Sequence, residues 1–206
     1  MSIIITHEVI KEALSYPAYV ELAGHLIENR QTTGIDHSDD SVSKSAQNLL
    51  IIQDLLETIT IQEQVIKILQ VYQVPLTWLA ITESWCIDSA NSLPVIYKMS
   101  QVNANIQLKV ILRDSSSIID NFTTRGSRSI PKVICLDAES LVVLGVWGPR
   151  PAELEAKIMV KVKHLNNAPN NDEIKRREKI RSIIKSWYNE NQAQSIQQEV
   201  LESLIP

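Results

Sequence analysis

The chain has 206 residues, of which 44% are hydrophobic and 21% are charged, and its formal net charge is −4. No run approaches the roughly 20 apolar residues of a membrane-spanning helix, and the first residues lack the pattern of a secretion signal. A mildly acidic chain offers no broad electrostatic field for polyanions, although a local patch can still bind nucleic acid. We therefore expect a cytoplasmic protein that has neither a membrane partner nor a nucleic-acid partner.

The chain contains two cysteines, Cys86 and Cys135, which are too few for a disulfide framework. Its four histidines are scattered and give no zinc-binding spacing with these cysteines. The sequence therefore predicts no metal site and no cofactor. Each of the two thiols needs its own explanation.

The first third of the chain, residues 1–73, is predicted to be a helical extension. Its apolar residues fit one or two amphipathic helices interrupted near Pro17, followed by a polar loop over residues 31–41. A second helical pattern covers residues 45–74. Residues 60–63 fit a capping box, so this pattern predicts either one helix or two helices in line.

Residues 74–167 change character and predict an α/β core with a mixed sheet. Short apolar runs indicate strands, and a tight turn at residues 137–140 indicates a hairpin. The predicted strands are 76–82, 106–112, 131–136 and 141–146. The predicted helices are 86–102, which contains Pro94, then 116–123, and a third that begins after Pro151.

The remaining residues, 168–206, predict a C-terminal helical extension that belongs to the same compact unit. After a first helix in this extension, a second, short helix is predicted to begin at Ser195, where residues 195–198 fit a capping box. The basic stretch at residues 175–185 is interleaved with acidic residues and lacks an aromatic series, so we interpret it as a solvated helix face.

Cys86 lies where the first core strand is predicted to meet a helix. The unpaired amides and the dipole of a helix N-terminus favour a thiolate, so this position suits a reactive cysteine. A buried structural cysteine is the alternative, and position alone does not decide between the two.

Three local motifs occur together: the run Trp85-Cys86-Ile87-Asp88-Ser89 at the head of a predicted helix, Pro94 inside that helix, and Ile130-Pro131 at the start of the hairpin. Together they resemble the thioredoxin-like superfamily. The strings ITESWCIDSA, RGSRSIPK and WGPRP are similar to an uncharacterised bacterial branch of the family with a WCxDA-type motif. The resemblance implies a thioredoxin-like mixed sheet flanked by helices, with Pro131 in the cis form.

Two departures from the family pattern limit the chemistry that the resemblance implies. Ser89 stands where dithiol thioredoxins have their second cysteine, and Ala80 stands where they have a buried acid. A serine cannot resolve a mixed disulfide. If Pro131 packs against Cys86, as the resemblance implies, Cys135 lies four strand residues further, about 13 Å away, which is too far to bridge to Cys86. We therefore interpret Cys135 as a core thiol.

The favoured function is a monothiol thiol–disulfide oxidoreductase with Cys86 as nucleophile and a low-molecular-weight thiol or a protein disulfide as partner. Asp88 is the second candidate catalytic residue: it either shuttles a proton or is a solvated acid that suits the helix dipole. The candidate substrate-binding residues are Trp85, Ser89, Arg128, Ile130 and Pro131. Arg125 and Arg128 either bind a carboxylate of a small thiol or are simply solvated. The alternative function is a non-enzymatic module that binds a protein or a peptide.

Overall fold

The protein, seen here in a computed structural model that describes residues 5–166, 173–191 and 193–205, is built around a mixed five-stranded sheet with the order β1-β3-β2-β4-β5. Strand β2 pairs in parallel with β3, and the other neighbouring pairs are antiparallel. The strands are β1 (Leu14–Ser15), β2 (Leu76–Thr82), β3 (Ile106–Leu112), β4 (Lys132–Asp137) and β5 (Val143–Trp147).

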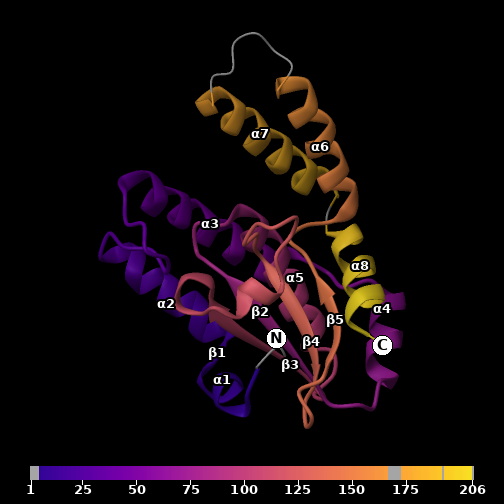
Figure 1. The fold of residues 1–206 in the computed structure, drawn as a ribbon. Helices are drawn as coiled ribbons and strands as arrows, with labels where there is room; N and C mark the ends of the chain where they lie inside the picture. Colours follow the sequence, from indigo (N-terminus) through magenta and orange to yellow (C-terminus); the bar gives the residue numbers. More distant parts are fainter. Residues whose placement is uncertain (1–4, 167–172, 192, 206) are drawn as a thin grey trace.

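Helices cover the sheet and extend beyond it (Figure 1). Helix α3 packs on α5, α8 packs on β5, and the pair α6 and α7 projects away from the sheet. The helices are α1 (His7–Glu12), α2 (Tyr16–Glu28), α3 (Asp39–Thr58), α4 (Glu63–Val71), α5 (Ile87–Ser100), α6 (Ala152–Asn166), α7 (Glu173–Asn191) and α8 (Gln194–Leu204). In the described part of the chain, none of them combines the length and apolar composition that crossing a bilayer requires.

Strand β2 is buried over its whole length, because both faces of the sheet carry a hydrophobic core. Trp78 and Ala80 point into the larger core, which also includes residues of α5 and α8. Leu79 and Ile81 point into a smaller core on the opposite side. The loop that follows β2 is therefore held at the junction of two packed layers.

Most of the predicted core elements are confirmed. Strands β2 and β3 have the predicted bounds, β4 and β5 begin one and two residues later than predicted, and Pro94 lies inside α5. The predicted helix at 116–123 is wrong: short 3-10 turns at Arg113–Ser115 and Ile118–Asn121 replace it. The Ser116 hydroxyl accepts a hydrogen bond from the Ile118 amide at 3.2 Å, a local bond that competes with helix formation.

Both predicted capping boxes are wrong. Helix α4 begins after Gln62, and α8 begins after Ala193, a residue with φ of 62°; neither helix has a side-chain cap. Gln197 is buried instead and bonds across the fold, accepting from the Gln62 amide at 2.8 Å and donating to the Thr60 carbonyl at 3.0 Å. The predicted boundary between residues 167 and 168 lies outside the described residues.

Candidate functional site

Cys86 is the N-cap residue of α5, at the end of the loop that leaves β2. Its thiol donates to the carbonyl oxygen of Ile130 at 3.3 Å, and the following Ile130–Pro131 peptide is cis, as the resemblance implies. The residue is 7% exposed. The structure thus places Cys86, Ile130 and Pro131 together, three residues of the predicted site.

The surroundings of Cys86 favour the protonated thiol. Burial, and after it the charge of Asp88, raises the pKa of Cys86 to about 11. The Ser89 hydroxyl and the amides of Asp88 and Ser89 act in the opposite direction. The start of α5 therefore does not outweigh the cost of burying a thiolate in this state of the protein.

Asp88 is buried within the first turn of α5 rather than solvated. Its Oδ2 forms an ion pair with Nη2 of Arg150 at 2.7 Å, and its Oδ1 accepts a hydrogen bond from the Tyr188 hydroxyl at 3.0 Å. Burial raises the pKa of Asp88 to about 6, while Arg150 and Tyr188 oppose the rise. Sequence reasoning did not connect either residue with Asp88, because they lie 62 and 100 residues further along the chain; Arg150 belongs to the string WGPRP, but nothing in that string indicates its partner.

Arg150 lies on a turn that also contacts the cis-proline strand. The Gly148–Pro149 peptide is cis, and Gly148 has φ of 105°, a conformation that favours glycine. The buried Lys132 donates to the Gly148 carbonyl at 2.8 Å, so the residue after Pro131 ties β4 to this turn. Arg150 also lies 3.4 Å from Glu155 at the start of α6.

Trp85 is held from two sides. The guanidinium of Arg113 lies 4.7 Å from the centre of its ring, a cation–π contact. The loop before α3 approaches so closely that a Cβ on Gly34 would lie 2.8 Å from the indole nitrogen. The Trp85 ring is thus covered by the N-terminal part of the chain.

Glu83 fixes that loop and was not predicted as a site residue. Its side chain is fully buried, accepts from the Thr33 hydroxyl, and accepts from the Asp114 amide at 2.9 Å. Burial raises its pKa. A carboxylate directly after a seven-residue apolar strand was the signal in the sequence.

The other predicted site residues differ in their surroundings. Ser89 is buried, and its hydroxyl has no hydrogen-bond partner among the described residues. Arg128 donates to both carboxylate oxygens of Asp120, at 2.6 and 2.7 Å, and Arg125 forms an ion pair with Glu155 at 2.7 Å. Arg125 also contacts the Met159 sulfur at 3.0 Å, so both arginines have partners within the chain itself.

Cys135 lies on the other side of the sheet from Cys86. It is fully buried opposite Trp78 in the larger core, whereas Cys86 belongs to the smaller core. Both cysteines are free. This arrangement agrees with the interpretation of Cys135 as a core thiol.

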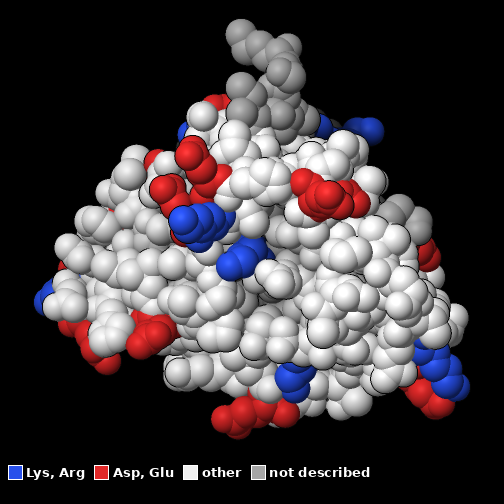
Figure 2. All heavy atoms as spheres, turned by 90° about the horizontal axis from the view of Figure 1, so that it is seen from below, with Lys and Arg blue, Asp and Glu red and all other residues white. Residues whose placement is uncertain are grey.

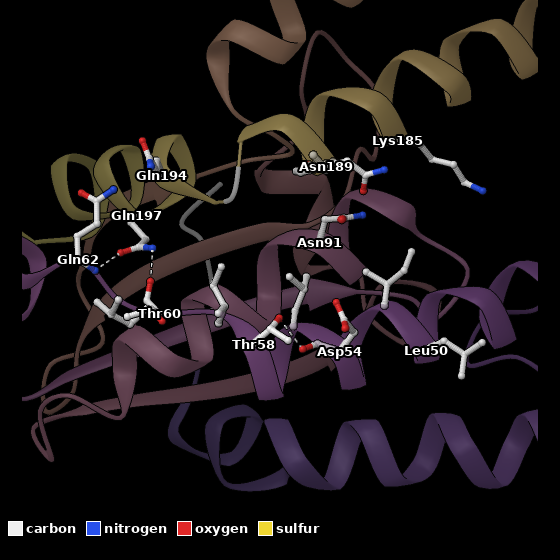
Figure 3. Close-up of a pocket in the computed structure, with 15 residues that line it drawn as sticks. Leu50, Asp54, Thr58, Thr60, Gln62, Asn91, Lys185, Asn189, Gln194 and Gln197 are labelled. Carbon is white, nitrogen blue, oxygen red and sulfur yellow. Dashed lines mark hydrogen bonds between the residues drawn. The ribbon is translucent and has the colours of Figure 1, made fainter.

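A groove of about 950 Å³ lies beside α5, between α3, α7 and α8 (Figure 3). Its lining combines apolar residues of α3 with polar side chains such as Asn91, Lys185 and Asn189, and it includes Tyr188. Tyr188 therefore connects the groove to the buried Asp88.

Among the described residues, no three His, Cys, Asp or Glu side chains are grouped as metal ligands. On the face shown in Figure 2, acidic and basic side chains are scattered between wide uncharged areas.

Comparisons with known proteins agree with this geometry. The family model described as "Thioredoxin" (Thioredoxin_9) matches residues 34–169. A protein of unknown function from Pseudomonas aeruginosa has a similar fold, with a TM-score of 0.54 and 18% identity over 89% of this chain and 99% of that one. An HIV epitope-scaffold gives a TM-score of 0.52 and 20% identity over 72% of this chain and 79% of that one. No curated protein matches the chain. Since the family model covers well over half of its residues, the chain belongs to the thioredoxin family.

Proposed function

We propose that the protein performs thiol–disulfide exchange with a single cysteine, Cys86. The observation that carries the proposal is the position of its sulfur, at the N-terminus of α5 and 3.3 Å from the carbonyl that precedes cis-Pro131. A helix N-terminus favours negative charge on a sulfur that has become accessible. The partner is the disulfide of a low-molecular-weight thiol or of a protein.

The exchange has two balanced steps. Cys86 gives its proton to water or buffer, and its thiolate attacks one sulfur of a disulfide R–S–S–R′. A Cys86–S–S–R bond forms, the R–S–S–R′ bond breaks, and R′–S⁻ leaves and is protonated. An external thiol R″–SH then loses its proton, and its thiolate attacks the R-bound sulfur of the mixed disulfide; R–S–S–R″ forms, the bond to Cys86 breaks, and the Cys86 thiolate leaves and is protonated. Ser89 cannot supply this second thiol, so the external one is required.

Ile130 and Pro131 are the proposed contact for the substrate backbone. Both residues are buried directly before β4, and the Ile130 carbonyl accepts the hydrogen bond of the Cys86 thiol. An extended partner chain would pair with this segment when the local cover opens. Trp85 is partly buried and packs against the smaller core, which includes Cys86 and Ile130. These residues suit an extended peptide or a glutathione-like molecule.

A non-enzymatic binding module is the second candidate function. The observation in its favour is that Cys86 is 7% exposed and has a pKa raised to about 11. In this case the cis-proline segment binds a peptide and the thiol only fills the core beneath it.

The two functions differ in the reactivity of folded Cys86. The folded protein is incubated with oxidised glutathione between pH 7 and pH 10, and intact mass is measured. Exchange predicts one glutathione adduct, present in Cys135→Ser, absent in Cys86→Ser, and released by dithiothreitol. The matched Cys135→Ser variant keeps one thiol in the same fold, so it controls for loss of a cysteine as such.

The opposite result is also defined. If the folded protein gains no adduct at any pH, while both cysteines react in urea, thiol–disulfide exchange is ruled out and the binding module remains.

A further inference from the structure

The buried Asp88 is held by two residues from outside the strands and helices that surround Cys86. Arg150 comes from the turn before α6, and Tyr188 comes from the last turns of α7. Each contacts a different oxygen of the carboxylate, at 2.7 Å and 3.0 Å. The two donors come from separate segments and together define the plane of the carboxylate. They therefore fix its position as well as stabilising its negative charge.

Both partners are themselves held in place. Arg150 contacts Glu155 at 3.4 Å as well as Asp88, and only 19% of its side chain is exposed. The Tyr188 hydroxyl lies 3.4 Å from the Ser92 hydroxyl, and Tyr188 packs edge-on against Trp187. A buried carboxylate with two such partners stays ionised at pH values where an isolated buried one would take up a proton.

The groups that act on Asp88 and Cys86 come from several elements. Asp88 lies in the first turn of the helix that Cys86 caps, and its charge acts on the thiol; Tyr19 of α2 and Tyr188 of α7 are also within electrostatic range of the sulfur. The titratable and charged groups around the pair are Arg150, Glu155, Tyr19 and Tyr188. Among the charged groups, Asp88 contributes most to the raised pKa of Cys86.

We propose that Arg150 and Tyr188 are positioning residues, which keep Asp88 as a fixed carboxylate behind Cys86 and thereby set the pH range in which the thiol reacts. The inference rests on the proposed function and names how its site is regulated. A fixed negative charge in the first turn of α5 disfavours the Cys86 thiolate, so the free protein resists indiscriminate reaction. The C-terminal extension thus contributes to the site through Tyr188.

The first measurement is the rate of alkylation of Cys86 by iodoacetamide against pH, in a Cys135→Ser background. Asp88→Asn removes the charge but keeps the side-chain shape, and we expect its alkylation to be about tenfold faster than wild type between pH 7 and pH 9. Glu153→Gln breaks an exposed ion pair with Lys157 on α6 and is the matched control; its profile should be unchanged.

The second measurement follows the Asp88 carboxyl carbon by NMR in protein labelled with ¹³C-aspartate, its signal being assigned by its loss in Asp88→Asn. Arg150→Gln and Tyr188→Phe should each move the titration midpoint of Asp88 upward from about 6, and Arg150→Lys should move it less than Arg150→Gln. Tyr72→Phe, a tyrosine on the far side of the fold near Cys135, should leave it in place. A purely structural role would not move this midpoint selectively.

The outcomes separate the two proposals. An alkylation profile of Asp88→Asn that superimposes on wild type, or an Asp88 midpoint unmoved in Tyr188→Phe, overturns the present inference even if the glutathione adduct forms. The absence of that adduct, with both shifts observed, counts against the proposed function alone. If Arg150→Gln does not fold, as judged by circular dichroism, Tyr188→Phe carries the test.

Discussion

The two cysteines have similar pKa values but different surroundings. Burial raises the pKa of each thiol to about 11. Cys135 lies in the middle of β4, fully buried in the larger core. Cys86 lies where a strand ends, with a helix terminus, a cis-proline and a buried ion pair around it. The comparison shows that burial alone does not separate a core thiol from a candidate nucleophile; what separates them is how little of the structure must move to expose the sulfur.

The largest expected difference is in accessibility. With iodoacetamide at pH 9, Cys86 should be labelled in the folded protein, whereas Cys135 should wait for unfolding of the sheet, a protection of roughly 10³-fold or more. Peptide mass mapping over time measures both rates in one sample. Equal labelling rates would mean that the same opening of the structure exposes both cysteines. This result would contradict the distinction between Cys135 as a core thiol and Cys86 as a candidate nucleophile.

A second change gives Cys86 a neighbouring thiol. In Ser89→Cys the new sulfur lies one helical turn from Cys86, within the range that a disulfide spans. On oxidation we expect a loss of two hydrogen atoms by intact mass and faster release of a glutathione adduct. Asn91→Cys, five residues beyond Cys86, is the matched control and should form no such bridge. A failure of Ser89→Cys to oxidise would show that the first turn of α5 does not present both side chains together.

The third prediction concerns stability against pH. The pKa of Asp88 is raised from 3.8 to about 6, so the folded state holds a proton that the unfolded chain releases. Its contribution is therefore complete below about pH 4 and is lost as the pH rises through about 6, by at most about 3 kcal/mol. The difference in urea unfolding free energy between wild type and Asp88→Asn isolates this slope, because Glu83, whose pKa is also raised, is present in both. A difference that is flat from pH 4 to pH 7 would contradict it.

The smallest expected effect comes from the loop that covers Trp85. A Cβ in Gly34→Ala would lie 2.8 Å from both the Trp85 indole nitrogen and an Asp114 oxygen, so the loop must shift. We expect alkylation of Cys86 to be about two to five times faster, with Cys135 unchanged, since only the local cover is loosened. In the control Gly24→Ala, the new Cβ would be at an ordinary 3.8 Å from Leu49. Equal effects in both variants would show that the loop does not cover the thiol.

The sheet core was predictable because its strands carry their own signal. Leu76–Thr82 is a short, mostly apolar run after Pro75, and Ile106–Leu112 is a mostly apolar stretch that ends at Arg113-Asp114, so each strand is visible in its own residues. Strand β1 was missed because it has two residues within a helical pattern and exists only through pairing with Lys109 and Val110. The short helix predicted at 116–123 is absent, and there the Ser116 hydroxyl accepts a hydrogen bond from the Ile118 amide instead.

The candidate site was predictable only along the chain, not across it. The cysteine, its helix and the cis-proline follow from local motifs. The ionisation of the site does not, since it depends on Arg150 and Tyr188 meeting Asp88 through tertiary packing. The same limit explains why Arg128 was placed at the substrate, although its described contacts are with Asp120.

The bond between Tyr188 and Asp88 joins residues 100 positions apart, and this distance has a consequence for biosynthesis. A ribosome completes every strand of the sheet before it adds Tyr188. During that interval the first turn of α5 has a carboxylate that lacks one of its two donors, so the nascent thiol has a different electrostatic environment from the finished one. Cys86 therefore acquires its full electrostatic environment only when α7 docks, after its own strand and helix have been made.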